Sequence, residues 1–527
     1  MTAPAPVAPA NPGMVTLTIE GRTVVVPPGT NLIEAAKTAG VLIPHYCYHP
    51  SLPVAGVCRM CLVEVEKFPK LTPACATTVG EGQVVHVHSD KARDARKGVL
   101  EFLLINHPLD CPICDQSGEC ELQDYTFAEG RKDSRYMEPK RFNPMEDFGG
   151  DVLYVPNRCI LCTRCVRFMD VVAADPVLNV SERGDRAYIG KFEGHDLTHA
   201  WAGNVVDLCP VGALLSKDFL NKARAWELDR AASICPGCSQ GCNVMIEMRD
   251  NVVVRIRPRP NAAVNQHFAC EVGRLGYRWI NRRDRLEYPR VRTTAGLITA
   301  SWSEAITAAA AAIGGASRVT VLVSPSLSNE TLFLLSRIAS FVQGDAVMSV
   351  LRGSEAPLPG AKDLALRAER AANHTGAGLL GFTEVLSPLA GLGADDLVIA
   401  VDTAASMAPI PDGVRVIVIG TVLDDVLAQA AIVALPVCNF AEEDGTFTNL
   451  RGRVQRFLQA KAPPAQVRPS YRVISELAAT IGAGSYPALA SEIFTAMAAE
   501  VPAFGGLSYR KLGLQGGPAA LLTEVTA

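Results

Sequence analysis

The placement of cysteine is the feature that most constrains this chain. Sixteen cysteines occur in 527 residues, fifteen of them lie between Cys47 and Cys270, and only Cys438 comes later. A disulfide framework would be spread more evenly, and the first residues lack the basic flank and apolar stretch of a signal peptide. Reduced thiols are therefore expected. Because Cys-x2-Cys spacing among reduced thiols indicates metal sites, we expect the first half of the chain to bind metal.

The first candidate ligand set follows a pattern of short strands and a helix. It consists of Cys47, Cys58, Cys61 and Cys75. Ahead of it, Val15–Glu20 and Arg22–Val26 alternate like two strands joined at Gly21, and Asn31–Ala39 predicts a helix. This order resembles the β-grasp ferredoxins that hold a [2Fe–2S] cluster. Plant-type ferredoxins place four residues before the Cys-x2-Cys pair, so the loop here is longer.

The first set has two other interpretations. Cys47-Tyr48-His49 resembles half of a Rieske pair, but the partner Cys58-x2-Cys61 offers no second histidine. Four thiolate ligands are therefore predicted, with His45 and His49 as bystanders. A four-cysteine zinc site remains open, because spacing alone does not exclude it.

The second set combines one histidine with three cysteines. It consists of His107, Cys111, Cys114 and Cys120. Ser89–Asn106 predicts a helix, and Pro108 disfavours helical geometry at His107, so the imidazole lies where the chain turns into the cysteine loop. A lone histidine is usually structural, but a site with four ligands needs one more donor here. An imidazole in place of a thiolate removes one negative charge, which should raise the reduction potential.

The third set has the spacing of bacterial [4Fe–4S] ferredoxins. It consists of Cys159, Cys162 and Cys165, with Cys209 before Pro210. Those ferredoxins carry two triplets and exchange their fourth ligands, whereas this chain has one triplet, so Cys209 should complete the same cluster. Zinc seldom takes this triplet. The polar neighbours Arg158, Thr163, Arg164 and Arg167 could tune the cluster, but they are interpreted as solvated surface groups.

The fourth set lies around a predicted strand at Val252–Ile256. It consists of Cys235, Cys238, Cys242 and Cys270. The pattern resembles the cluster that opens the molybdopterin-dependent oxidoreductases, and it favours iron over zinc.

Local sequences around these cysteines resemble one family. The segments are Cys58–Val65 (CRMCLVEV), Cys111–Asp124 (CPICDQSGECELQD), Arg158–Phe168 (RCILCTRCVRF) and Gly203–Leu214 (GNVVDLCPVGAL). They are similar to the large iron–sulfur subunit of bacterial respiratory complex I, the NADH:quinone oxidoreductase. The resemblance runs from Val15 to about Ile280. It implies ligand roles for all sixteen residues of the four sets, with a [2Fe–2S] cluster at the first and [4Fe–4S] clusters at the other three.

The second half of the chain predicts a doubly wound α/β domain. Arg318–Val323, Asp396–Val401 and Val414–Ile419 have the pattern of buried strands, and Ser328 could cap a helix. Asn439–Gln455 resembles the closing segment of the molybdopterin-oxidoreductase fold. No cysteine falls between Cys270 and Cys438, so the usual metal-ligating thiol of the molybdenum enzymes is missing. A shortened, degenerate domain without a molybdenum cofactor is expected, with Cys438 as a small buried residue.

The predicted fold is multidomain, α+β followed by α/β. We expect a disordered tail at 1–13, a β-grasp domain at 14–95 and a one-His/three-Cys domain at 96–145. A ferredoxin-like domain at 146–228, a molybdopterin-oxidoreductase-type cluster domain at 229–285 and the degenerate α/β domain at 286–527 follow. Translation could start at Met1 or Met14.

Charge and hydropathy exclude several classes of protein. A net charge of −4 argues against a nucleic-acid binder, and no apolar run is long enough to span a membrane. A soluble, cytoplasmic chain without catalytic residues or a complete active site of its own is expected.

The resemblance implies an electron-transfer subunit of proton-translocating NADH:quinone oxidoreductase. Its partners would be the flavin-bearing, NADH-binding subunit and the quinone-side iron–sulfur subunits. Electrons would pass through the first, third and second sets in turn. The complex would hold the chain at the cytoplasmic face of the inner (plasma) membrane. The alternatives are an electron-transfer subunit of a soluble NAD-linked hydrogenase or formate dehydrogenase, and a zinc-stapled scaffold without redox function.

Overall fold

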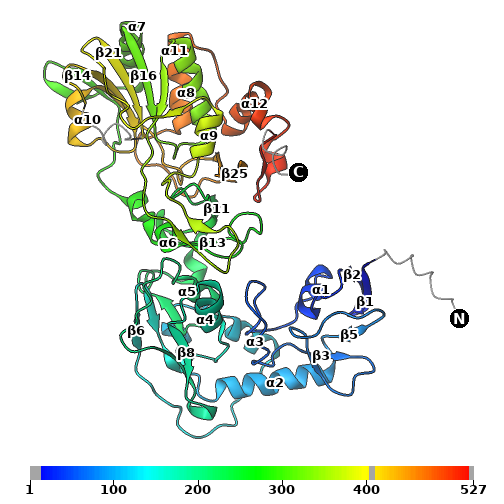
Figure 1. Ribbon diagram of the computed structural model, residues 1–527. Helices are drawn as coiled ribbons and strands as arrows, with labels where there is room; N and C mark the ends of the chain where they lie inside the picture. Colours follow the sequence, from blue (N-terminus) through cyan, green and yellow to red (C-terminus); the bar gives the residue numbers. More distant parts are fainter. Residues whose placement is uncertain (1–12, 403–409, 521–527) are drawn as a thin grey trace. The chain divides into compact units, whose positions relative to one another are not determined.

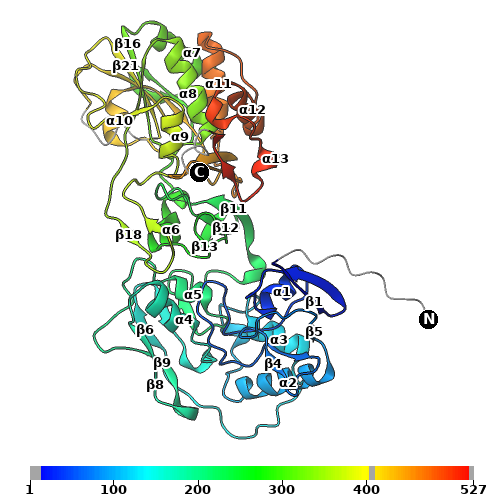
Figure 2. The ribbon, with the colours of Figure 1, turned by 45° about the vertical axis from the view of Figure 1, so that its right-hand side comes forward.

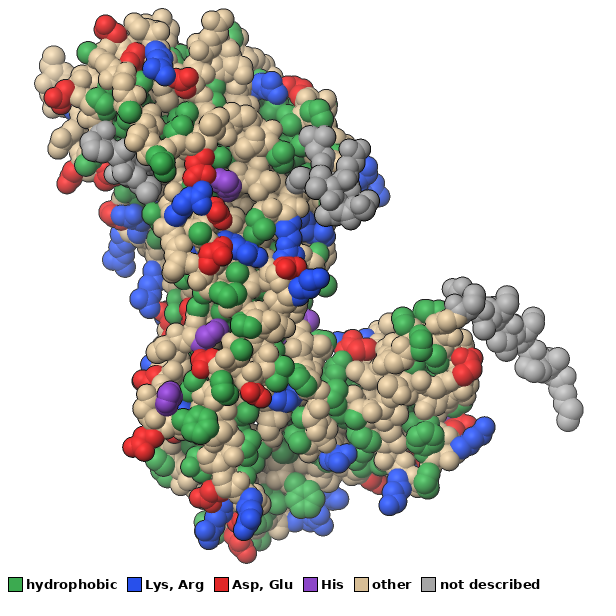
Figure 3. Space-filling model, in the orientation of Figure 1, with side chains coloured by type: hydrophobic (Ala, Val, Ile, Leu, Met, Phe, Trp, Pro, Cys, Tyr) green, Lys and Arg blue, Asp and Glu red, His purple; other side chains and the backbone are tan. Residues whose placement is uncertain are grey.

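The computed structural model describes residues 13–402 and 410–520 of the chain (Figure 1). The chain divides into two compact units, Met1–Glu227 and Leu228–Ala527. The predicted disordered tail, apart from Gly13, lies outside the described residues. Within the described part, no helix is long and apolar enough to cross a membrane. On the face drawn in Figure 3, basic and acidic side chains are interspersed.

The first unit begins with a mixed five-stranded sheet in the order β2-β1-β5-β3-β4. Its strands are β1 (Val15–Ile19), β2 (Arg22–Val26), β3 (Leu62–Val65), β4 (Thr72–Pro73) and β5 (Val84–His86). β1 pairs antiparallel with β2 and parallel with β5. Helix α1 (Leu32–Thr38) begins after Asn31, whose side-chain oxygen accepts a hydrogen bond from Glu34 N at 3.0 Å. The two predicted strands and the predicted helix are confirmed.

Alternation of side chains explains how this sheet forms a core. Leu17 and Ile19 of β1 and Val24 and Val26 of β2 are all buried, because every second residue of a strand points to the same face. Cys61 belongs to the same core cluster. The first ligand set therefore borders a packed hydrophobic core.

A long helix connects this sheet to the rest of the first unit. It is α2 (Asp90–Leu104), and its N-cap Ser89 accepts a hydrogen bond from Ala92 N at 3.3 Å, which confirms the predicted helix. Fully buried Arg96 of α2 donates to Val87 O at 2.9 Å and pairs with Glu129 at the end of α3 (Glu121–Glu129). Because a buried guanidinium must have partners, this contact fixes α2 to both neighbours.

Short elements complete the first unit. They include a three-stranded sheet in the order β10-β7-β6 and a two-stranded ribbon of β8 and β9. The bounds are β6 (Glu146–Gly149), β7 (Val152–Tyr154), α4 (Arg164–Arg167), β8 (Leu178–Ser181), β9 (Tyr188–Lys191), α5 (Asn204–Leu208) and β10 (Leu214–Ser216). A single-turn π-helix, Phe168–Val172, follows α4.

The second unit starts with an antiparallel sheet and continues into an α/β sheet (Figure 2). The first sheet is β11 (Asp229–Ile234), β12 (Asn243–Arg249) and β13 (Val252–Pro258), followed by α6 (Glu271–Leu275). The larger sheet has the order β15-β14-β23-β22-β21-β16-β17-β20, and its strands from β23 to β20 are parallel.

The large sheet and the elements around it have the following bounds. Its strands are β14 (Arg290–Thr293), β15 (Gly296–Thr299), β16 (Arg318–Val323), β17 (Asp345–Met348), β20 (Thr383–Glu384), β21 (Asp396–Val401), β22 (Arg415–Gly420) and β23 (Ala431–Pro436). The helices are α7 (Trp302–Gly314), α8 (Asn329–Phe341), α9 (His374–Leu379), α10 (Asp425–Ala430), α11 (Ser470–Ile481), α12 (Ala490–Glu500) and α13 (Tyr509–Leu512). Two small sheets are β18 (Ala356–Pro357) with β19 (Ala365–Leu366), and β24 (Gly445–Thr448) with β25 (Arg453–Phe457) and β26 (Gly517–Pro518).

Helices cover both faces of the large sheet. Leu397 and Ile399 of β21 belong to a core shared with α7, α8 and α11, whereas Val398 and Ala400 belong to a second core that includes Leu427 of α10. A strand buried on both faces is a continuous apolar run, which is why β16, β21 and β22 were predictable. The doubly wound domain is confirmed, as is Ser328 as N-cap of α8, accepting from Thr331 N at 3.2 Å. The antiparallel strands β14 and β15 at its edge were not predicted.

Removal of one partner of a buried ion pair should strongly lower the stability of the second unit. Both guanidinium nitrogens of Arg285 lie 2.9 Å from the Glu442 carboxylate, and the two side chains are 4% and 0% exposed. Arg285→Met leaves the Glu442 carboxylate buried beside the backbone N–H of Asn439, at 3.1 Å, and Lys461 Nζ, at 3.9 Å. We expect this to cost about 3 kcal/mol, measured by hydrogen exchange of the β21–β23 amides in the full chain. The control Arg318→Met removes a pair that is 53% and 45% exposed and should cost less than about 1 kcal/mol. If the two variants lost the same amount of stability, the greater importance of the buried pair would be contradicted.

Candidate metal centres

The first ligand set lies in the loops around β3 and β4. Cys47, Cys61 and Cys75 are buried and Cys58 is half-buried. Hydrogen bonds from the thiols of Cys58 and Cys75 hold the pKa of Cys47 well below its usual value, and the contact with Cys47 raises the pKa of each partner. The Cys75 thiol likewise lowers the pKa of Cys61. The four sulfur atoms are therefore neighbours and can ligate one group.

The two histidines beside this set have other partners. His45 Nδ1 lies 2.7 Å from Ile43 O, and His49 Nδ1 accepts a hydrogen bond from Ser51 N at 3.2 Å. Both contacts are local and hold each imidazole against its own backbone segment.

The second set lies between α2 and α3. Cys111 begins a 3₁₀ turn (Cys111–Ile113), Cys114 follows it, and Cys120 is the N-cap residue of α3. Burial raises the pKa of Cys114, and it raises that of Cys120 to about 11, with the other two thiols close enough to add to the effect on Cys120. A Cβ atom at Gly212 would collide with Cys114 Sγ. The three cysteines are therefore neighbours, with Cys114 buried, Cys120 half-buried and Cys111 exposed.

His107 of the second set is a buried imidazole. Its Nδ1 atom has no hydrogen-bond partner among the described residues. Burial, and to a smaller extent the nearby positive charge of Arg158, lowers the pKa of His107 to about 4. The imidazole is therefore neutral at pH 7, which is the form that binds a metal. Arg158 also acts on Cys114, so His107 and the cysteine loop share a neighbour.

The third set surrounds a small cavity in the first unit. Its walls include Cys159, Cys162, Cys165 and Cys209. Burial raises the pKa of the thiols of Cys159 and Cys209 to about 11 and that of Cys162 to about 12. Leu161 and Thr163 adopt left-handed backbone conformations, with φ of 51° and 59°, a conformation that non-glycine residues rarely adopt without a structural or functional reason. The loop therefore curls around the space between the four thiols.

The fourth set belongs to the second unit. Cys235 follows β11, Cys242 precedes β12, and Cys270 is the N-cap residue of α6. All four thiols are buried, and burial raises the pKa of Cys270 to about 11. A Cβ atom at Gly273 would lie 2.8 Å from Cys235 Sγ and 3.8 Å from Cys270 Sγ. The glycine therefore leaves room for the sulfur atoms.

The donor sets match the chemistry of iron–sulfur clusters. None of the cysteines is in a disulfide, and thiolates with one imidazole are soft ligands that select such clusters or zinc. Over residues 13–402 and 410–520, no three or more His, Cys, Asp or Glu side chains are placed to hold a single metal ion. Two observations fit side chains that surround a bound group. The Nδ1 atom of His107 is buried without a hydrogen-bond partner among the described residues, and Gly212 and Gly273 leave room for the sulfur atoms of Cys114 and Cys235.

The interpretation of the arginines near the third set as solvated groups was wrong for two of them. Arg158 and Arg164 are only 7% and 5% exposed. Arg158 donates to Asp110 Oδ2 at 3.0 Å, and Arg164 donates to Tyr48 O at 2.8 Å. The only signal in the sequence is that both residues directly precede a candidate ligand cysteine.

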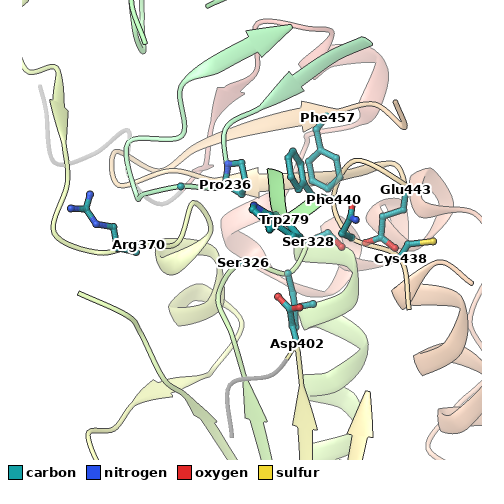
Figure 4. A pocket seen from close by; sticks show the side chains of 13 residues that line it. Pro236, Trp279, Ser326, Ser328, Arg370, Asp402, Cys438, Phe440, Glu443 and Phe457 are labelled. Carbon is teal, nitrogen blue, oxygen red and sulfur yellow. The ribbon is translucent and has the colours of Figure 1, made fainter. Parts of the chain in front are cut away.

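Sequence reasoning also missed a cavity of about 240 Å³ in the second unit (Figure 4). It opens at the carboxyl ends of β16 and β21, where the strand order reverses, which is where ligands bind in doubly wound sheets. Burial raises the pKa of Asp402 to about 6 and that of Glu443 to about 8. Asp402 and Glu443 line this cavity, together with Pro236, Gly237, Ser326, Ser328 and Cys438. Cys438 is buried as predicted.

Five family models match the chain in order. They are a 2Fe-2S iron-sulfur cluster binding domain (residues 13–90), the NADH-ubiquinone oxidoreductase-G iron-sulfur binding region (96–135) and the ferredoxin-like domain of NADH-quinone oxidoreductase subunit 3 (149–215). The molybdopterin oxidoreductase Fe4S4 domain (229–282) and the molybdopterin oxidoreductase model (402–480) follow. The chain thus joins domains of the iron–sulfur binding type to parts of a molybdopterin-oxidoreductase fold, as predicted.

Curated relatives narrow the class. The G-type NADH-quinone oxidoreductase subunit of Rickettsia bellii is 41% identical over 324 residues, covering 61% of this chain and 47% of that relative. The mitochondrial NADH-ubiquinone oxidoreductase 78 kDa subunit of Candida albicans is 43% identical over 300 residues, covering 56% and 42%. The chain is therefore a homologue of the G-type NADH-quinone oxidoreductase subunits. The matched part spans less than half the length of these relatives.

One solved structure also matches part of the chain. It is an NAD+-reducing [NiFe]-hydrogenase in the H2-reduced state, with 30% identity, and the match covers 40% of this chain and 90% of that one. The TM-score is 0.37.

Gly273 offers a test of the fourth set that leaves every ligand in place. Alanine is normally the better helix former, but in Gly273→Ala the new methyl group would displace Cys235 Sγ. We expect purified Gly273→Ala chain to lose about four iron atoms relative to the wild type, measured by iron analysis. The control Gly276→Ala adds a methyl group with nothing within 4 Å and should keep its iron. Full iron content in Gly273→Ala would contradict the placement of this set.

Proposed function

We propose that this chain is an electron-transfer subunit of a proton-translocating NADH:quinone oxidoreductase. It would take electrons from the flavin-bearing subunit and pass them toward quinone. One observation carries the proposal: each of the first four family models encloses one complete ligand set. At each of the four sets, the ligand spacing and the family match fall on the same residues.

The proposed ligands are the sixteen residues of the four sets. The first would hold a [2Fe–2S] cluster through Cys47, Cys58, Cys61 and Cys75. The other three would hold [4Fe–4S] clusters through His107, Cys111, Cys114 and Cys120, through Cys159, Cys162, Cys165 and Cys209, and through Cys235, Cys238, Cys242 and Cys270. Bound clusters would supply one-electron carriers, and the chain would have no catalytic residues of its own.

The protein's own groups would tune these carriers through hydrogen bonds to sulfur. Backbone N–H groups donate at 3.4 Å from Cys47 to Cys58 Sγ, from Leu161 to Cys159 Sγ and from Gly237 to Cys235 Sγ. Such bonds stabilise negative charge on the ligand and so raise the reduction potential. The neutral imidazole of His107 would act in the same direction, because it adds no charge of its own.

The partners and location follow from the same proposal. The flavin-bearing subunit and the quinone-side iron–sulfur subunits would bind the chain, and the complex would hold it at the cytoplasmic face of the inner membrane. The α/β domain would bind no molybdenum cofactor. Its cavity of about 240 Å³ is smaller than the usual pocket for a cofactor-sized ligand.

The metal content of the complex tests the cluster assignment. With two irons in the first set and four in each of the others, we expect about 14 iron atoms per chain. The measurement is iron and zinc analysis, with low-temperature EPR, of the purified holo-protein, and molybdenum and tungsten analysis of the complex copurified from native membranes. Zinc in place of iron at two or more sets would contradict the assignment, and stoichiometric molybdenum or tungsten would contradict the cofactor-free α/β domain.

Removal of single ligands tests which sets conduct. We expect Cys162→Ala to abolish NADH:quinone electron flow, because a series path fails at any missing carrier. Cys238→Ala removes a ligand from the fourth set, in the other unit, and should lower assembly or thermal stability while turnover per assembled complex stays near normal. The measurement is quinone reduction normalised to intact complex. If Cys238→Ala loses normalised turnover as Cys162→Ala does, the fourth set conducts.

A further inference from the structure

Two arginines of α4 connect the ligand sets of the first unit. Arg164 is 5% exposed. Its guanidinium donates to Tyr48 O at 2.8 Å and to Leu208 O at 3.2 Å, and it pairs with Glu121 at 3.3 Å. Tyr48 follows Cys47 of the first set, Leu208 precedes Cys209 of the third, and Glu121 follows Cys120 of the second. One buried cation therefore contacts residues adjacent to ligands of three sets.

Arg167, one helical turn later, contacts the ligand residues themselves. Its Nη2 donates to Cys47 O at 2.6 Å and to Cys162 O at 3.1 Å, and its Nη1 donates to Pro53 O at 2.5 Å. The same nitrogen thus joins the main chains of a first-set and a third-set cysteine. Arginine suits this position because its planar fork donates in several fixed directions and is always charged.

Resting on the proposed function, we infer that Arg164 and Arg167 are positioning residues for electron transfer between the first and third sets. They fix the main chains of the two sets to one helix and place permanent positive charge beside both. Positive charge favours the reduced state of a site, since that state carries one more electron. Removal of either charge should therefore make both sets harder to reduce.

Arg158 makes a similar connection between the loops of the second and third sets. It directly precedes Cys159, and its guanidinium pairs with Asp110, the residue before Cys111, at 3.0 Å. It is buried, so its charge is little screened by solvent. Each pair of successive sets on the proposed path therefore has a buried arginine between its loops.

The test is an EPR redox titration of the first-set and third-set signals in the intact complex. In Arg167→Gln we expect both potentials to fall, with a threefold to tenfold change in the reduction equilibrium, up to about 59 mV for one electron. Arg164→Gln should lower both as well. Arg167→Lys keeps the charge and should stay close to wild type. The matched control, Arg183→Gln, removes an exposed charge of the same unit and should shift neither.

The outcomes separate this inference from the proposed function. Loss of both clusters in Arg167→Gln but not in Arg167→Lys would also support it, because no ligand has been removed. Unchanged potentials in Arg164→Gln and Arg167→Gln, a shift confined to one set, or an equal shift in Arg183→Gln would overturn it. An unsubstituted complex without iron–sulfur signals from these sets would overturn the proposed function instead.

Discussion

Withdrawal of thiol groups from water is the physical constraint on which the first unit depends. Burial disfavours the charged form of a thiol, and it raises the pKa of Cys159, Cys162 and Cys209. Thiolate ligands in such a place need compensating positive charge or hydrogen-bond donors. The buried guanidinium of Arg164 and the backbone N–H of Leu161 lie where such compensation is needed. A loop that supplies fixed hydrogen-bond donors can stabilise buried thiolates, which would be unfavourable in an apolar core.

The convergence of the candidate ligands accounts for the irregular backbone around the four sets. Ligands that converge on one point cannot all lie on a regular helix or strand, so most of them are in loops or at the ends of short elements. Leu161 and Thr163 adopt left-handed conformations within one such loop. Gly212 and Gly273 lie where a side chain would meet the sulfur of a candidate ligand, Cys114 and Cys235 respectively. At these four positions, a left-handed backbone or a glycine lies where the placement of the thiols decides the path of the chain.

The second unit obtains its stability differently, from a sheet buried on both faces and polar networks at its edge. The fourth set is tied to this unit: next to Cys242, the side chain of Asn243 donates to Gln455 Oε1 of β25 at 2.5 Å, and Gln455 in turn donates to Gly241 O at 2.8 Å. Three sets thus share one compact unit, whereas the fourth shares the other with the α/β sheet. That division is the structural basis for expecting different consequences from Cys162 and Cys238.

The amino-acid sequence by itself determined the local features of this protein. Apolar runs located β16 and β21 with correct bounds, Asn31, Ser89 and Ser328 marked helix starts, and cysteine spacing grouped the candidate ligands, because each of these signals acts within a few residues. Tertiary structure alone decided the strand order, the cavity at the carboxyl ends of β16 and β21 and the burial of the arginines. Arg164 meets Tyr48 across 116 residues and Arg167 meets Cys47 across 120. Such contacts depend on how distant segments pack, and no local periodicity encodes them.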